Sequence, residues 1–453
     1  MKDVINQDIN KRNYMNSKSV NPWAWIPTLY FAQGIPYFIV NTVSVMMFTK
    51  MGVPNGEMAF FTSLLYLPWM IKPFWSPFVD IFKTKRWWTV TMQLLMAAAF
   101  ILLTITLPVP EAETIAAGNT PMSMFYITLM LFVITAFASA THDIAADGFY
   151  MLALSTGDQA QFVGIRSTFY RLSSIFGQGV LVAIAGMIET NTNDIPFSWR
   201  ITMLVTAVVF TLVALYHTFI VPRPATDKST LGGQKATAGA IFSEFGRTFK
   251  TYFMKKGVWL AIIFMLLYRL PEAFLIKLCM PFLVAKQELG GLGMSTASVG
   301  IAYGTIGVLF LTIGGILGGI YASKVGLKKS LWVMATCMTL PCITFVYLAI
   351  CQPENLALIS TAIAIEQFGY GFGFTAYMLY MMYFSDGEFK TSHYAICTAF
   401  MAASMLLPGM VAGYIQEAIG YVNFFWMVMA CCVATLVVTF FVDKKVDPNY
   451  GKK

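Results

Sequence analysis

Charged residues are scarce in this chain of 453 residues, where Asp, Glu, Lys and Arg together make up 11%. A soluble domain carries about 25% charged residues, so an ordinary soluble fold is excluded. Hydrophobic residues make up 57% of the chain. They form recurrent apolar runs of about 20 residues, each long enough to cross a bilayer as a helix. The sequence therefore predicts an all-α membrane protein that crosses the bilayer many times.

Histidine and cysteine are also few. The three histidines are scattered, and none of the seven cysteines forms a Cys-x-x-Cys pair. Metal and redox sites need clusters of such ligands. We therefore expect no metal and no cofactor, and we interpret the cysteines as small packing residues.

The apolar runs define twelve candidate spans. They are residues 23–49, 57–80, 87–108, 122–151, 165–189, 199–221, 257–283, 296–321, 331–351, 356–384, 392–416 and 422–442. The segment before the first span is polar and lacks the apolar core of a signal peptide, so we expect span one to act as an uncleaved signal.

Lys and Arg are distributed asymmetrically about these spans. They gather in the N-terminal segment, in the loops after even-numbered spans and in the C-terminal tail. By the positive-inside rule both termini are cytoplasmic. The net charge of +8 follows from this topology, which indicates the lipid bilayer, and not nucleic acid, as the partner.

The two groups of six spans resemble each other. Tyr150-Met151 and Thr168 recur as Tyr380-Met381 and Thr398, at a constant offset of 230 residues (150 to 380, 168 to 398). Parallel six-helix repeats are typical of major facilitator transporters. We expect one bundle over residues 1–221, a cytoplasmic basic linker over 222–256 and a second bundle over 257–453, in a monomer.

The linker between the bundles carries aromatic residues at helical spacing with basic residues among them. This pattern is typical of an amphipathic helix that lies on the cytoplasmic leaflet. A solvated linker is the alternative.

Two aspartates, Asp143 and Asp147, lie four residues apart in a largely apolar run, which places them on one helix face. A charge inside the membrane is costly, so both should face a wet cavity or a partner. Under the 230-residue offset they correspond to Gly373 and Tyr377, so only one half carries them. They could couple transport to protons or gate it; alternatively, they pair with Arg166 or Arg171 to lock helices together.

Four motifs in the first half resemble AmpG-type muropeptide permeases of the major facilitator superfamily. They are Gln33-Gly34-Ile35-Pro36, the segment from Lys72 to Asp80, the segment from Ala140 to Asp147, and Gly164 to Leu172. The resemblance implies proton-driven import, across the bacterial inner membrane, of N-acetylglucosamine linked to anhydro-N-acetylmuramic acid, with or without a peptide.

Polar stripes on spans one and five suit a glycan. Amides beside aromatic rings can bind hydroxyl and N-acetyl groups, and a guanidinium can bind a carboxylate. Helix–helix contacts are the alternative for span one, and pairing with Asp147 is the alternative for Arg171. The candidate substrate residues are Tyr30, Gln33, Tyr37 and Asn41 on span one, and Arg171, Ser174 and Gln178 on span five.

The second half offers further candidates on spans seven and ten. They are Arg269, Glu272 and Lys277 for a charged contact, Tyr370 and Tyr377 for the substrate, and Glu366 as a second proton site. Arg269 and Glu272 are three residues apart and could instead neutralise each other. In the first half, Asp80 begins a loop of basic residues and is a candidate gate.

These features together favour a secondary active transporter that works by alternating access, rather than an enzyme. An importer of other oligosaccharides is the alternative. A glycan-processing membrane enzyme is more distant, because neither a metal motif nor a nucleotide motif accompanies the aspartates.

Overall fold

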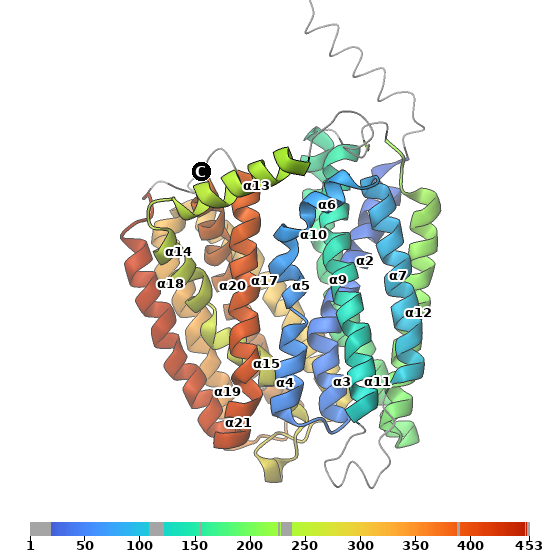
Figure 1. The fold of residues 1–453 in the computed structure, drawn as a ribbon. Helices are drawn as coiled ribbons and strands as arrows, with labels where there is room; N and C mark the ends of the chain where they lie inside the picture. The colour runs from blue at the N-terminus through green and yellow to red at the C-terminus, as the bar shows by residue number, and fades with distance from the viewer. Residues whose placement is uncertain are drawn as a thin grey trace, which may run out of the picture.

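The computed structural model describes residues 20–107, 122–154, 156–224, 227, 238–386, 390–448 and 450, and every regular element in these ranges is helical. The helices form two groups that lie side by side in Figure 1. The N-terminal group is blue to green, and the C-terminal group is yellow to red.

The N-terminal group follows the six predicted spans. Its elements are η1 (Pro22–Ala24), α2 (Ile26–Phe38), η2 (Ile39–Val43), α3 (Ser44–Lys50), α4 (Asn55–Leu64), α5 (Leu67–Ile71), η3 (Lys72–Phe74), α6 (Ser76–Ile81), α7 (Lys85–Thr106), α9 (Met122–Ala153), α10 (Thr156–Ser174), η4 (Ile175–Leu181), α11 (Val182–Thr192) and α12 (Ile195–Ile220).

The C-terminal group has corresponding helices. Its elements are α14 (Val258–Leu267), α15 (Leu270–Val284), η6 (Gln287–Leu289), α16 (Thr296–Val299), η7 (Gly300–Gly307), α17 (Val308–Val325), α18 (Leu327–Thr339), η8 (Leu340–Cys342), α19 (Ile343–Cys351), α20 (Leu356–Ser385) and α21 (Lys390–Asp443). Within α21, Gly420 is non-helical with φ 75° and separates two helices.

Proline explains where the structure departs from unbroken spans. Predicted span two is divided into α4, α5, η3 and α6, and Pro68, Pro73 and Pro77 each lie at the start of one of the last three. Pro271 likewise begins α15 after a break at Tyr268 and Arg269. Proline lacks the N–H that a continuous helix needs.

Nine helices in the described ranges are long and apolar enough to cross a membrane. One of them, His393–Asp443, covers predicted spans eleven and twelve. Residues 55–81 and α20 occupy the positions of the two remaining predicted spans. The protein is therefore a multi-pass membrane protein, and the number twelve stays a prediction.

The linker contains α13 (Ala238–Phe253), which lies across one end of both helix groups, at the side where the C-terminus is marked (Figure 1). Its Phe245 and Phe249 contact Phe74 of η3 at ring-centroid distances of 6.1 and 5.6 Å. Tyr252 is fully buried against the C-terminal group. The linker thus contains a helix, and three of its aromatic residues pack on protein. Its predicted place on the cytoplasmic leaflet stays a prediction.

Candidate functional site

A cavity of about 680 Å³ lies between the two helix groups and is lined by both. Sites for small molecules have volumes of about 300–1,000 Å³. The lining includes π-helical turns from three predicted spans, η2, η4 and η7. Such turns frequently occur at functional sites. The cavity is therefore the candidate substrate site.

A partly buried ion pair lies on the N-terminal wall of the cavity. Lys72 Nζ donates to Asp143 Oδ2 at 2.8 Å, and the side chains are 25% and 20% exposed. Gln33 Nε2 donates to the other carboxylate oxygen of Asp143. Lys72 is absent from the predicted site, although a lysine within an apolar run is itself a signal of function.

Asp147 lies outside the cavity lining, and its side chain is 41% exposed. Its Oδ1 accepts hydrogen bonds from Arg166 Nη2 at 2.9 Å and from Tyr30 Oη at 3.1 Å. The Arg166 guanidinium also lies 4.4 Å from the centroid of the Tyr30 ring. The structure thus separates the two aspartates: Asp143 faces the cavity, while Asp147 and Tyr30 belong to a neighbouring cluster.

Arg171 faces the cavity and not Asp147, because it lies five residues beyond Arg166 on another face of α10. Its Nη1 donates to the carbonyl oxygen of Thr312, in the opposite group, at 3.4 Å. Ser174 and Gln178 also line the cavity, and Gln178 Nε2 donates to Ser174 Oγ at 2.8 Å.

Two amide oxygens of the first predicted span lack a hydrogen-bond partner among the described residues. Gln33 Oε1 and Asn41 Oδ1 are buried at the cavity and accept no hydrogen bond from any described residue. Asn41 Nδ2 donates to the carbonyl oxygen of Tyr37 at 3.0 Å, which fixes the amide. A buried acceptor without a partner is costly, so a bound ligand with hydroxyl or amide donors would stabilise it.

Aromatic rings form much of the N-terminal wall. Tyr37 packs edge-on against Trp69 at 5.2 Å and against Tyr66 at 6.4 Å, and it lies 6.4 Å from Tyr170. All four line the cavity. Only Tyr37 was predicted, because the sequence does not reveal which aromatic residues of an apolar span face inward. Their rings offer flat apolar surfaces, which suit the faces of a sugar.

The C-terminal wall contains one neutralised cation. Arg269 donates to both carboxylate oxygens of Glu272, at 2.8 and 3.0 Å, and also to Tyr370 Oη at 2.8 Å. Arg269 and Tyr370 line the cavity, whereas Glu272 lies behind them. The mutual neutralisation considered from the sequence is thus what the structure shows.

Lys277 is buried in the same wall, and no described carboxylate forms an ion pair with it. Its Nζ lies 5.8 Å from the centroid of the Tyr66 ring. With Arg171 it makes two cavity cations, one from each group, that lack a carboxylate among the described residues. Since the other charged residues of the lining are paired, these two are the side chains best placed to bind an anion.

Two other predicted residues, Glu366 and Tyr377, lie away from the cavity. Glu366 is buried and accepts a hydrogen bond from Gln367 Nε2 at 2.8 Å. Tyr377 is fully buried, donates to the carbonyl oxygen of Met265 at 2.7 Å and stacks on Tyr268. Asp80 is in α6, and its side chain lies outside the described residues.

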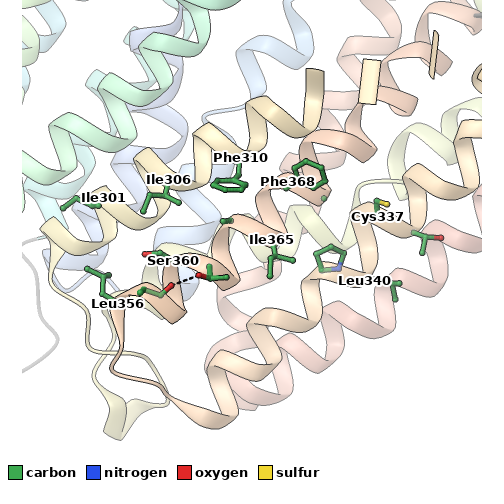
Figure 2. A pocket seen from close by; sticks show the side chains of 15 residues that line it. Ile301, Ile306, Phe310, Cys337, Leu340, Leu356, Ser360, Ile365 and Phe368 are labelled. Carbon is green, nitrogen blue, oxygen red and sulfur yellow. Dashed lines mark hydrogen bonds between the residues drawn. The ribbon is translucent and has the colours of Figure 1, made fainter. Parts of the chain in front are cut away.

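A second hollow, of about 980 Å³, lies on the outer surface of the C-terminal group. Figure 2 shows its apolar lining. Ile301 and Phe310 come from η7 and α17, Ile365 comes from α20, and Leu340 comes from η8. Ile301, Leu340 and Ile365 are 48%, 59% and 50% exposed, so the hollow opens outward. It is separate from the central cavity.

The Major Facilitator Superfamily model matches residues 28–392. The chain belongs to this superfamily. Among solved structures, this facilitator resembles a D-xylose–proton symporter with a TM-score of 0.70 and 12% identity over 96% of this chain and 100% of that one. It also resembles an inward-facing bacterial Spinster homologue with a TM-score of 0.66, 13% identity and 95% and 98% coverage. These likenesses show the fold.

Curated relatives of this facilitator include one named as a permease and one named as an AmpG transporter. It is 24% identical to the anhydromuropeptide permease of Escherichia coli strain K12 over 420 residues, 90% of this chain and 77% of that protein. It is also 24% identical to an AmpG-named transporter of Rickettsia felis, over 92% of this chain and 96% of that one. The resemblance to AmpG-type permeases is confirmed, and the protein is a membrane transporter of a small molecule.

Proposed function

We propose that this transporter imports anhydro-muropeptides, or a closely related acidic amino-sugar oligosaccharide, across a bacterial inner membrane by alternating access. Both termini lie in the cytoplasm in this proposal, and the protein acts as a monomer. The observation that carries the proposal is the pair of cavity cations, Arg171 and Lys277, that no described carboxylate neutralises.

The chemistry of the substrate matches the rest of the lining. A muropeptide has sugar rings, hydroxyl and N-acetyl groups, and carboxylates on the lactyl group or the peptide. The aromatic wall suits the rings, and the amide oxygens of Gln33 and Asn41 suit hydroxyl and amide donors. Two cations in opposite groups suit two separated carboxylates, and a bound substrate would then join both walls.

Proton coupling belongs to the same proposal, through Asp143. A proton on its carboxylate would remove the charge that holds Lys72, and Lys72 would then be a third cavity cation. Substrate affinity would thereby depend on the protonation of Asp143. Glu366, which is buried but outside the lining, is the second candidate for this proton.

An importer of neutral oligosaccharides is the other candidate, favoured by the same aromatic wall and free amide oxygens. Uptake into proteoliposomes of labelled anhydro-muropeptides and of neutral di- and oligosaccharides separates the two. We expect the acidic substrates to be taken up and the neutral sugars to be refused.

Two variants sharpen this test. Lys277→Gln removes one charge-assisted contact, which is worth about 1.5–3 kcal/mol, so the KM for acidic substrates should rise roughly tenfold or more. Arg171→Lys keeps the charge but loses the planar fork and should weaken the same substrates less. Lys286→Gln, an exposed lysine just beyond α15, is the control. Equal effects of Lys277→Gln on acidic and neutral substrates would contradict the proposal.

A further inference from the structure

Two hollows on the surface of the C-terminal group adjoin each other. The apolar hollow described above is the larger, and a polar hollow of about 540 Å³ lies beside it. Leu356 lines both, and Ser298 of the polar hollow is three residues before Ile301 of the apolar one (298 to 301). Neither hollow shares a described lining residue with the central cavity. One ligand could therefore occupy both hollows without entering the substrate site.

The apolar hollow opens toward the hydrocarbon of the membrane. Its walls come from η7 and α17, from α18 and η8, and from α20 (Figure 2). The first two walls belong to segments that are long and apolar enough to cross a membrane. Along α20 the hollow extends from Leu356 to Gly369, 13 residues (356 to 369) that rise about 20 Å as a helix. The hydrocarbon of one leaflet is about 15 Å deep, half of the bilayer core. An acyl chain of that leaflet is therefore the ligand class that this hollow fits.

Close helix contacts limit one end of the apolar hollow. An added Cβ at Gly369 would be 2.2 Å from the carbonyl oxygen of Cys337 in α18. An added Cβ at Gly314 of α17 would be 2.2 Å from the carbonyl oxygen of Phe368. The helices thus touch backbone to backbone at this end. The other end, at Leu356, adjoins the polar hollow, so a chain that lies along the hollow places its polar end there.

The polar hollow has three charged side chains in its lining. Lys286 and Glu288 come from the loop after α15, and Glu354 comes from the turn between α19 and α20. All three are exposed, and none forms an ion pair with a described residue. Two carboxylates beside one lysine suit a ligand that carries both a positive and a negative group.

Hydrogen bonds fix the two loops that carry these charges. Gln352 Nε2 donates to the carbonyl oxygens of Gln287 and Gly291, at 3.1 and 3.0 Å. The backbone N–H of Gly293 donates to the carbonyl oxygen of Ala285 at 2.7 Å, which closes the loop after α15. The loop and the turn before α20 are thereby held together, so the three charged residues belong to one fixed platform.

We propose that the two hollows together bind one phospholipid whose head group combines a phosphate with a primary ammonium. One acyl chain lies in the apolar hollow, the phosphate contacts Lys286, and the ammonium donates to Glu288 and Glu354. A head group with a net negative charge meets two carboxylates against one lysine, and a quaternary ammonium has no N–H to donate. Both should therefore bind more weakly. This inference goes beyond the proposed function and does not depend on the identity of the substrate.

Photo-cross-linking in vesicles tests the proposal. Phosphatidylethanolamine with a diazirine on its acyl chain should label peptides of α17, α18 and α20 that line the apolar hollow. Unlabelled phosphatidylethanolamine should compete for this labelling roughly fivefold better than phosphatidylglycerol or phosphatidylcholine, as expected for exposed ion pairs. The double variant with Glu288→Gln and Glu354→Gln should lose this preference. Glu57→Gln, which changes a carboxylate outside both hollows, is the control and should keep it.

A second set of variants tests the position of the acyl chain. Thr361→Trp places a large ring in the apolar hollow from an exposed position of α20 and should remove most of the labelling there. Leu358→Trp, 41% exposed on the same helix but outside the lining, is the matched control and should keep the labelling. Ile365→Trp, at a half-exposed position of the lining, repeats the test if Thr361→Trp fails to fold.

Three results would overturn the proposal. One is equal competition by the three lipids, and another is unchanged labelling in the folded tryptophan variants of the lining. The third is a dimer of this chain that Thr361→Trp disrupts, because a second copy of the chain would then fill the hollow.

Discussion

Helices α9 and α20 occupy equivalent places in the two repeats, yet they hold different chemistry. In α9, Asp143 faces the cavity and binds Lys72. At the equivalent place in α20, Gly373 packs so closely against α18 that an added Cβ would be 2.4 Å from Met338 Cβ. The comparison shows that the scaffold does not need the charge. We therefore expect the ion pair to serve transport, and the C-terminal group carries its own charges on α15 instead.

The largest effect should come from breaking the ion pair in α9. Asp143→Asn leaves Lys72 without its carboxylate; losing one partner of a buried pair costs about 3–5 kcal/mol, and less here because a fifth to a quarter of each side chain is exposed. We expect accumulation of substrate against a gradient to be lost, while counterflow exchange partly remains. Uptake by proteoliposomes with and without a proton gradient measures both.

Two further variants test whether the effect of Asp143→Asn is specific to the ion pair. Asp147→Asn, one turn away but outside the cavity, should retain accumulation better. The double variant with Asp143→Asn and Lys72→Met should lose less stability than the two single variants lose in sum, because neither charge is left without its partner. If Asp143→Asn still concentrates substrate like the parent, the proton is carried elsewhere, with Glu366 next to be tested.

The second prediction concerns the equivalent glycine. Gly373→Ala places a methyl group 2.4 Å from Met338 Cβ and 2.6 Å from the carbonyl oxygen of Met334, so α18 and α20 must separate. Overpacking of this kind costs about 1–3 kcal/mol. Thermal unfolding should detect the loss of stability, and substrate KM should change little. Gly319→Ala, at a glycine with no atom within 4 Å of an added Cβ, is the control.

The sequence predicted the all-helical membrane fold because the length and recurrence of apolar runs are properties of the sequence. It also predicted Gln33, Asn41, Arg171 and Lys277 at the cavity, since polar residues in apolar spans seldom face lipid. It did not predict which partner each charge takes. Arg166 and Arg171 are both near Asp147 in the sequence, and only the rotation of α10 assigns Arg166 to it.

Helical spacing also did not distinguish aromatic residues that face the cavity from aromatic residues that pack against other helices. Tyr370 and Tyr377 lie seven residues apart on one face of α20, and both were predicted to contact substrate. In the structure Tyr370 lines the cavity, whereas Tyr377 packs under α14. The direction a face points depends on neighbouring helices, which periodicity does not contain.

The smallest predicted effect separates these two tyrosines. Tyr377→Phe removes the hydroxyl that donates to the carbonyl oxygen of Met265 but keeps the ring between its aromatic neighbours. A hydrogen bond of this kind contributes about 0.5–1.5 kcal/mol, so stability should fall by that amount while substrate KM is unchanged. Tyr370→Phe, the matched change at the cavity, frees Arg269 from one acceptor and should alter KM. If Tyr377→Phe changed KM as much as Tyr370→Phe does, Tyr377 would contact the substrate after all. That result would mean that α20 turns during transport.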